Sequence, residues 1–483
     1  MLFNSLTFLI FLGCFLLLWR WAKEYTRWRL LLILVASVVF YGWWDWRFLF
    51  LIFFTGSIDF LLALLLGVCR KIQNAKKQQI ISKILVSLSI ISGLGVLCIF
   101  KYSVFFAQLL NDIAGIFGIN FDLTKHIPEF CLILPIGISF YTFQSLSYTI
   151  DVYRKKIEPT KSFIHYMAYL MLFPQLVAGP IVRAVDLLPK LLQKPQTSSM
   201  VQYNALKLIV LGFFKKCVIA DNAATVVDTA FSHVNIYQGS WTWFLVMVMF
   251  SIQIYCDFSG YSDIARGIIK YMGYRFNLNF NHPYIACGLQ DFWSRWHISL
   301  SSWFRDYVYI PLGGNRKGKF RTLFNLFFTF LISGLWHGAA LNFITWGAFH
   351  GIIQIIEKLI KLPEFLKKHN SWYVIAANTV LTQLLVLTGW VFFRAASFTD
   401  AKNIIGRMVN FSAEVICFKP NSNPYVIFVV FLIMEFFLIK KFDCKLLRKY
   451  TFYRHLEPIL VGVLIVITIF YRGEEHGFIY FQF

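Results

Sequence analysis

The sequence predicts an all-α polytopic integral membrane protein. Of its 483 residues, 58% are hydrophobic and only 14% are charged, whereas about 25% of the residues of a soluble domain are charged. Many apolar runs approach the roughly 20 residues that a helix needs to cross the bilayer core. The runs do not alternate as the ten-residue strands of a membrane barrel would. We therefore expect about 11 transmembrane helices with additional re-entrant or interfacial helices, since a helix satisfies its own backbone in lipid.

The first five apolar runs are separated by connections in which positive charge alternates. The runs cover residues 2–19, 30–44, 48–68, 84–100 and 130–150. Connections 20–29, 69–83 and 151–161 hold four, five and four Lys or Arg residues. Connections 45–47 and 101–129 hold one and two. Because cytoplasmic loops are enriched in Lys and Arg, we expect the basic connections inside the cell and the N-terminus outside.

The rest of the chain holds further, less regular apolar runs. They lie near residues 164–180, 205–220, 241–256, 322–335, 339–360, 373–393, 424–440 and 457–471. Phe173-Pro174 and Gly179-Pro180 interrupt the first of them. Such breaks are tolerated at membrane depth where neighbouring protein satisfies the backbone. No internal repeat is visible, so the sequence predicts a single integral domain over residues 1–483, with N-terminal helices in 1–160 and C-terminal helices in 396–483.

The net charge of +22 does not indicate a nucleic-acid-binding protein. The Lys and Arg residues sit between apolar runs, where the anionic inner leaflet attracts them, and no base-reading or stacking module is present. The nine cysteines are scattered without a C-x-x-C pair. This spacing favours free thiols over disulfides or a zinc site, and we expect no metal. Membrane lipids are the partners that this composition predicts.

Residues 257–314 gather polar and ionisable side chains inside this apolar chain. Such groups are expensive at membrane depth and indicate a functional site. No Gly or Pro interrupts residues 290–306, so the spacing predicts one helix there. Its polar positions form one stripe, and they are Gln290, Ser294, His297, Ser301 and Arg305. The helix either lies at the interface with its Trp residues at the headgroups or lines a water-filled cavity.

His337 is the sharpest candidate for catalysis. It follows Trp336 inside an apolar helix pattern over residues 326–340, with Gly334 and Gly338 beside it. A neutral imidazole is the commonest general base, and small neighbours allow a substrate to approach. The alternative is a packing histidine bonded across helices. His350 and His282 are better explained as structural residues.

The loop after the predicted 290–306 helix is basic and glycine-rich. Gly313-Gly314 precedes Asn315 and Arg316 in a stretch with further Lys and Arg. Backbone N–H groups of such a loop can cradle phosphates, although an ordinary cytoplasmic loop has the same composition. The candidates for substrate binding are therefore Asn315 and Arg316 of this loop, Gln290, Ser294 and Arg295 of the predicted helix, and Trp336 beside His337.

No covalent machinery is visible in the sequence. It contains no G-x-S-x-G elbow, no phosphate-binding G-x-x-x-x-G-K-[ST] and no H-E-x-x-H motif. Group transfer by direct attack with histidine as the base therefore fits best. A transporter or flippase of a lipid or glycan precursor, or a membrane scaffold, would account equally well for helices with buried polar residues.

Several motifs resemble the membrane-bound O-acyltransferase family, in the bacterial branch that O-acetylates alginate. They are Phe173–Pro180, Tyr255–Ala265, Gln290–Ser299, Trp303–Asp306, Ile310–Asn315, Ser333–Ala339, Trp390–Arg394 and Phe478–Phe483. The resemblance spans nearly the whole chain and implies a helical fold around a central funnel, with a catalytic core in 161–395. By this resemblance His337 matches the family's essential histidine in Trp-His-Gly, and His297 matches the histidine of Arg-Trp-His at the same funnel.

The resemblance also implies an activity. Relatives of this kind move a small acyl group, here expected to be acetyl, from a cytoplasmic donor such as acetyl-CoA, with no bound cofactor. Their acceptor is an extracytoplasmic polysaccharide or peptidoglycan, often through a separate periplasmic transferase of the SGNH type. The implied location is the bacterial inner membrane. D-alanyl transfer to teichoic acid belongs to the same branch and remains an alternative.

Overall fold

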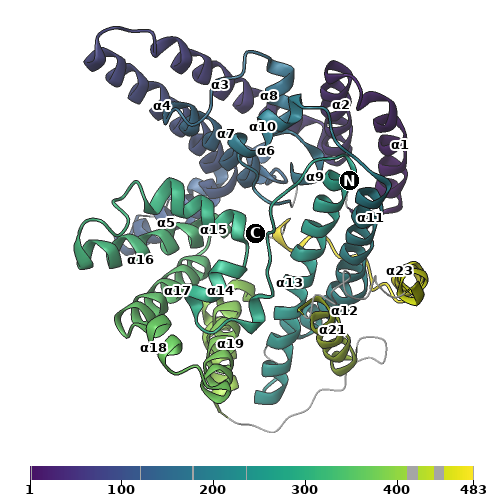
Figure 1. Ribbon diagram of the computed structural model, residues 1–483. Helices are drawn as coiled ribbons and strands as arrows, with labels where there is room; N and C mark the ends of the chain where they lie inside the picture. Colours follow the sequence, from purple (N-terminus) through teal and green to yellow (C-terminus); the bar gives the residue numbers. More distant parts are fainter. Residues whose placement is uncertain are drawn as a thin grey trace. The chain divides into compact units, whose positions relative to one another are not determined.

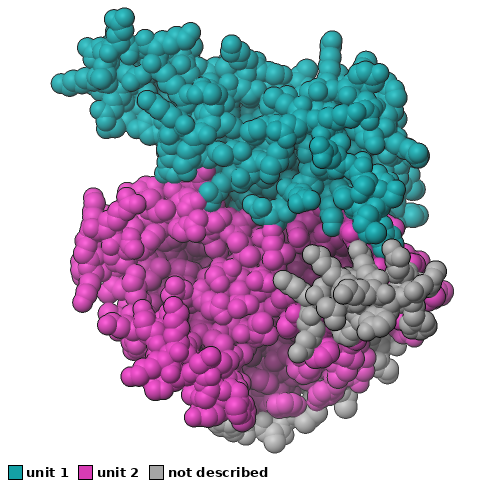
Figure 2. Space-filling view, in the orientation of Figure 1, with its two compact units in different colours: residues 1–203, 268–277 teal, residues 204–267, 278–483 magenta. Residues whose placement is uncertain are grey.

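The computed structural model describes residues 1, 3–119, 121–176, 179–234, 236–410, 423–439 and 451–481. These residues form helices joined by turns and loops, and no strand occurs among them. The predicted all-α class is therefore confirmed (Figure 1). The chain divides into two compact units, coloured separately in Figure 2. Unit 1 comprises residues 1–203 and 268–277, and unit 2 comprises residues 204–267 and 278–483.

Unit 1 is a helical bundle built from the N-terminal part of the chain. Its elements are α1 (Leu6–Ala22), α2 (Thr26–Asp45), α3 (Arg47–Cys69), α4 (Ala75–Leu97), a π-helical turn (Cys98–Tyr102), α5 (Ser103–Ile116), a 3₁₀ turn (Leu123–His126), α6 (Glu129–Leu132), α7 (Ile138–Tyr153), α8 (Phe163–Leu170), α9 (Phe173–Leu176) and α10 (Ala184–Leu192). Helix α4 runs on through the π-helical turn into α5. The expected connection 101–129 is therefore helical up to Ile116, because the apolar pattern of α5 continues the helix.

Unit 2 contains the remaining helices. They are the end of α11 (Ser199–Phe213), a π-helical turn (Phe214–Ala220), α12 (Asp221–Phe231), α13 (Ser240–Tyr271, except its last four residues), a 3₁₀ turn (Pro283–Ile285), α14 (Leu289–Arg295), α15 (Ile298–Phe304), a π-helical turn (Arg305–Tyr309), α16 (Gly318–His337), α17 (Leu341–Leu359), α18 (Leu362–Lys368), α19 (Trp372–Arg394), α20 (Phe398–Val409), α21 (Pro424–Ile439), α23 (Thr451–Phe470) and a 3₁₀ turn (Ile479–Phe481).

The long apolar helices can span a membrane. Among the described residues, five helices have the length and composition to cross, or six if the bent pair α17 and α18 forms one span. They are α2, α3, the continuous helix 75–116, α13 and α19. Helices α1 and α21 are apolar but shorter. The multi-pass character is thus established, whereas the total of about 11 spans stays a prediction.

Glycines allow helices α16 and α17 to pack with their backbones in contact. A Cβ on Gly334 would lie 2.2 Å from the carbonyl oxygen of Phe343, and one on Gly347 would lie 2.4 Å from that of Phe330. Only residues without a side chain permit this approach, which is typical of membrane helix pairs. The close crossing fixes the end of α16, where His337 lies, against α17.

Candidate active site

His297 lies at a break between two short helices and not within one long helix. Helix α14 ends at Arg295, Trp296 is extended, and His297 adopts a left-handed backbone with φ of 41° before α15 begins. The N–H groups of Ile298 and Ser299 donate to the backbone oxygen and Oδ1 of Asn279, at 2.9 and 3.2 Å. The predicted continuous helix over 290–306 is therefore wrong, because hydrogen bonds from a distant loop replace those of the helix.

The break turns His297 away from the predicted polar stripe. Gln290, Ser294 and Arg305 are exposed, whereas the His297 side chain is 1% exposed. Its ring packs at a centroid distance of 4.6 Å against Phe258 of α13 and 6.3 Å against Phe280. Of the two alternatives for this segment, an interfacial position for His297 is excluded, because the imidazole is enclosed by aromatic side chains.

His337 is the last residue of α16, since Gly338 is extended and ends the helix. The imidazole is 4% exposed. It lies at centroid distances of 5.0 Å from Trp346 of α17 and 5.2 Å from Phe393 of α19. Three helices of unit 2 thus hold the ring in place.

Two aromatic side chains connect the histidines. The Trp336 ring centroid lies 6.4 Å from His297 and 4.9 Å from His337. The Tyr480 ring lies 6.5 Å from His297 and 5.7 Å from His337. The structure therefore brings His297, Trp336 and His337 together, although 40 residues separate the two histidines. Their role in catalysis stays a prediction. We call these three residues and Tyr480 the histidine site.

Tyr480 is a further residue of this site, and the sequence alone did not predict it. Its hydroxyl is buried and has no hydrogen-bond partner among the described residues. Burial raises the pKa of the Tyr480 hydroxyl, so the phenol is protonated at neutral pH. The signal was present in the Phe478–Phe483 motif, whose last two residues lie outside the described part, but no local pattern connected that motif to the histidines.

A buried ion cluster places Tyr480. The ammonium of Lys216 lies 2.6 Å from Asp221 and 3.0 Å from Asp257, and it donates to the carbonyl of His476 at 3.1 Å. Asp257 in turn accepts a 2.8 Å hydrogen bond from the N–H of Ile479. The segment 471–480 is thus tied to the π-helical turn 214–220 and to α13 immediately before Tyr480.

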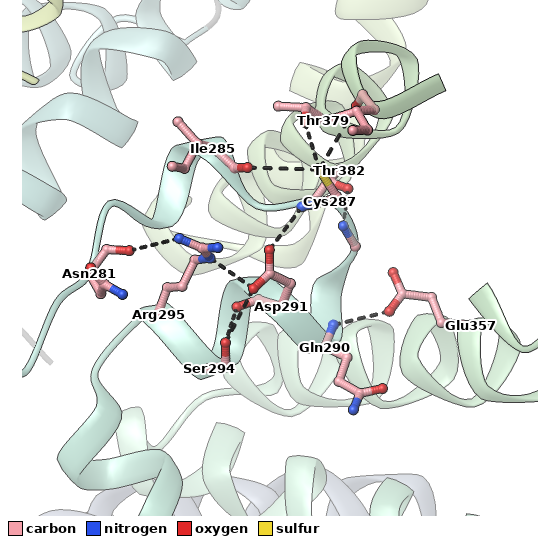
Figure 3. Close-up of polar contacts among 12 residues, drawn as sticks. Asn281, Ile285, Cys287, Gln290, Asp291, Ser294, Arg295, Glu357, Thr379 and Thr382 are labelled. Atoms are coloured by element: carbon pink, nitrogen blue, oxygen red, sulfur yellow. Dashed lines mark hydrogen bonds and ion pairs between the residues drawn. The ribbon is translucent and has the colours of Figure 1, made fainter. Parts of the chain in front are cut away.

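The start of α14 is held by one carboxylate from α17 and one hydroxyl from α19 (Figure 3). The N–H groups of Leu289 and Gln290 donate to Glu357 at 2.6 and 3.0 Å, which satisfies donors that a helix leaves open at its first turn. The N–H of Gly288 donates to Thr382 at 2.7 Å. This anchoring fixes α14 and therefore the turn that follows it.

Three of the predicted substrate-binding residues, Gln290, Ser294 and Arg295, lie on α14. Ser294 and Arg295 bind Asp291 on the same helix, at 2.7 Å through its carbonyl and 2.8 Å through its carboxylate. The side chain of Gln290 points away from Glu357 in Figure 3. Their visible contacts therefore support the helix, and a role in binding stays a prediction.

Asn315 and Arg316 lie at the opposite end of α16 from His337. Both are exposed in the loop before Gly318, and Asn325 binds this loop through the carbonyl of Gly314 at 3.0 Å. A helix of 20 residues is about 30 Å long. These two residues are thus separated from His337 by the length of α16.

The two remaining histidines that the sequence singled out, His350 and His282, make contacts that are typical of structural residues. His350 is buried with centroid distances of 4.8 Å to Trp346 and 5.3 Å to Trp293. His282 lies 2.7 Å from Glu435 of α21. These contacts agree with a packing role for His350 and an ion-pair or hydrogen-bonding role for His282.

Comparison with known proteins identifies the family. Residues 50–393 match the membrane-bound O-acyltransferase family. The probable alginate O-acetylase AlgI of Pseudomonas aeruginosa is 38% identical over 92% of this chain and 82% of its own length. The peptidoglycan O-acetyltransferase of Helicobacter pylori is 33% identical over 86% of this chain and 81% of its own. The teichoic acid D-alanyltransferase of Bacillus subtilis is 30% identical over 56% of this chain and 72% of its own.

The chain therefore belongs to the membrane-bound O-acyltransferase family, as its motifs predicted. It is a multi-pass membrane O-acyltransferase. The family match ends at Phe393, so it includes both histidines and Trp336 but not Tyr480. The long match to the Pseudomonas relative supports the family across most of the chain.

We predict that His297 and His337 act in one step. His337→Ala and His297→Ala should each reduce acyl transfer by at least about a hundredfold, which is the usual contribution of general acid–base catalysis. The double variant should be little worse than either single variant, because residues that act as a unit are non-additive. The measurement is the acyl-transfer rate in membranes with matched protein levels.

Exposed His369 provides the matched control. His369→Ala should keep wild-type activity. A shared step would be contradicted if the fold reductions in rate caused by His297→Ala and His337→Ala multiply in the double variant. It would also be contradicted if His297→Ala hardly changes the rate.

We predict that Tyr480→Phe lowers acyl transfer by roughly tenfold or more, since it removes a hydroxyl worth about 1.4 kcal/mol or more at the site. The aromatic ring and its packing remain, so expression should be unchanged. Tyr471→Phe changes an exposed tyrosine of the same segment and should have no effect. Equal activity of the two variants would remove Tyr480 from the functional residues.

Proposed function

We propose that this protein transfers an acetyl group from a cytoplasmic thioester donor, such as acetyl-CoA, towards an extracytoplasmic glycan. The observation that supports this proposal most directly is the burial of His297 and His337 around shared aromatic neighbours inside unit 2. Histidine is suited to proton transfer near neutral pH. Aromatic walls keep water from the thioester, which limits hydrolysis.

The reaction needs one proton acceptor and one proton donor. An imidazole takes the proton from a hydroxyl as its oxygen attacks the acetyl carbonyl, a C–O bond forms, and the C–S bond breaks. The proton then passes to the departing thiolate, so the products are an ester and a free thiol. His337 is the preferred base because it matches the Trp-His-Gly motif. Trp336 lies against both imidazoles, where its N–H can stabilise the developing oxyanion.

The Tyr480 hydroxyl adds a third reactive group. The Tyr480 ring lies at centroid distances of 6.5 and 5.7 Å from the imidazoles of His297 and His337, and its protonated hydroxyl can donate a hydrogen bond to the acetyl carbonyl. The Tyr480→Phe variant removes this donor.

The donor is expected to approach from the basic side of the protein. Exposed Asn315, Arg316 and the neighbouring cations of the loop would attract a polyanion such as acetyl-CoA by long-range electrostatics. The length of α16 separates this loop from His337, so the loop recruits the donor and the histidine site receives its thioester end. No bound cofactor is required.

The acceptor that we favour is alginate or a similar polysaccharide, with peptidoglycan next. This order follows the relatives, since the P. aeruginosa protein is named for alginate and the H. pylori protein for peptidoglycan. A periplasmic acyltransferase of the SGNH type is the partner that would pass the acetyl group to the polymer. The cell membrane concerned is the inner one.

The function is tested by comparing a deletion strain, the same strain with the wild-type gene and the same strain with His337→Ala. Ester-linked acetate and D-alanine are released from each envelope polymer by mild alkali and quantified. Wild type alone should restore acetate on one polymer, and labelled acetyl-CoA should supply it in membrane vesicles. Restoration by His337→Ala would overturn catalysis at this residue. Restored D-alanine, or unacylated precursor accumulating inside, would favour the teichoic acid or flippase alternatives.

We also propose that the N-terminus lies outside and that residues 70–83 and 154–161 are cytoplasmic, because both stretches are rich in Lys and Arg. In a cysteine-free background, a membrane-impermeant thiol reagent should label Phe117→Cys in intact cells. The same reagent should label Lys76→Cys only after the membrane is opened. Labelling of Lys76→Cys, but not Phe117→Cys, in intact cells would reverse the orientation.

A further inference from the structure

A polar cavity of about 170 Å³ lies in unit 2 beside the segment that carries His297. Its polar wall includes Lys215, Ser259, Asp263 and Arg266. Ligand pockets for drug-sized molecules measure about 300–1,000 Å³. The cavity therefore has room for a small polar group and not for a whole substrate.

The charged groups of this wall form one ion-pair network. Lys215 and Arg266 share one carboxylate, at 2.7 and 3.0 Å from the two oxygens of Asp263. These three groups carry one positive charge in excess. Glu435 is a second carboxylate beside this group: it interacts electrostatically with Lys215, accepts a 3.0 Å hydrogen bond from Tyr255 and lies 2.7 Å from His282. Anion binding therefore depends on the open Arg266 donor and not on an overall excess of positive charge.

Two donors at the cavity are unsatisfied by the protein. The Ser259 hydroxyl and the Arg266 Nε are buried and have no hydrogen-bond partner among the described residues. Ser259 is 2% exposed. Because buried polar groups are normally hydrogen-bonded, these atoms indicate a ligand with acceptor oxygens.

The remainder of the lining is apolar. Leu208, Leu211, Leu278 and Leu438 also border the cavity, and Leu278 is 42% exposed. Leu432, Phe436 and Phe437 of α21 are exposed as well. In a membrane protein such a surface faces hydrocarbon, so a molecule with an anionic head and an apolar tail matches both parts of the cavity.

We propose that this cavity binds the phosphate headgroup of a membrane phospholipid, whose acyl chains leave past the leucines. The phosphodiester carries one negative charge, which the neighbouring Lys215 and Arg266 cations attract. Its oxygens accept from Arg266 and Ser259. A soluble phosphate ester has the same phosphate group but no acyl chain to pack against the leucines. We therefore prefer a membrane lipid as the source of the phosphate.

The bound headgroup would lie next to Asn279, the residue whose hydrogen bonds hold the turn at His297. Asn279 and Phe280 line the cavity. Asn279 donates to Ser262 at 3.3 Å and accepts the N–H groups of Ile298 and Ser299. A lipid in the cavity therefore packs against the loop that holds the His297 turn. This link to catalysis rests on the proposed function, whereas lipid binding itself does not.

The test measures lipid retention by the purified full-length protein. Native mass spectrometry after detergent extraction should show a retained phospholipid on wild type. Arg266→Gln should lower its occupancy by roughly tenfold, as expected for the loss of one charge-assisted hydrogen bond. Exposed Arg20 supplies the control, and Arg20→Gln should retain the lipid.

A pair of bulky substitutions provides a second test in case Arg266→Gln does not fold. Leu438→Trp narrows the cavity border, whereas Leu432→Trp adds the same bulk on the exposed face of the same helix. Loss of lipid in the first variant only, with a photoactivatable phosphatidylglycerol in vesicles crosslinking to α11 or α21, supports the site. Equal retention in both variants would overturn it, as would displacement of the lipid by soluble glycerol phosphate.

Activity measurements separate this inference from the proposed function. A variant that loses the lipid but keeps normal acyl transfer would support the lipid site and contradict its link to His297. Lipid retained in an inactive wild-type protein would instead count against the proposed function alone.

Discussion

The buried ammonium of Lys216 is the interaction on which the histidine site depends. It neutralises Asp221 and Asp257 and binds the carbonyl of His476. A buried ion pair contributes little net stability, but the loss of one partner costs about 3–5 kcal/mol because a charge is then left uncompensated. The cluster therefore acts mainly as a positional constraint. It brings residues from the π-helical turn, from α12, from α13 and from the segment before Tyr480 to one point.

Around this anchor, the site is assembled from groups that are individually ordinary. An imidazole at the end of a helix, another at a break between helices and a phenol on an extended segment are common features. Their chemistry comes from shared neighbours, since Trp336 and Tyr480 each contact both histidines. Precise placement of this kind is what mutual packing of aromatic rings provides, because few rotamers fit.

The sequence predicted the class of fold and the two histidines because both depend on signals that are local. Apolar length predicts spanning helices, and Trp336-His337 and Trp296-His297 are motifs of adjacent residues. The break at His297 was not predictable, because the groups that cause it belong to Asn279, in a loop far from the helix pattern. Tyr480 was missed for the same reason, since its position depends on Lys216, more than 200 residues earlier. At His297, non-local hydrogen bonds overrode the helix periodicity. At Tyr480, the non-local hydrogen bonds had no sequence signature.

The π-helical turn Phe214–Ala220 limits which insertions and deletions this protein can accept during evolution. Two adjacent lysines in this turn reach different carboxylates, Lys215 to Asp263 and Lys216 to Asp221 and Asp257. A π-helical turn is an α-helix that has accommodated extra chain, and each α-helical residue turns the helix by about 100°. Deleting one residue here would rotate the two ammonium groups relative to α13. None of the seven residues of this turn is exposed, and its length is constrained as well, so gain or loss of a single codon in this stretch should be strongly selected against.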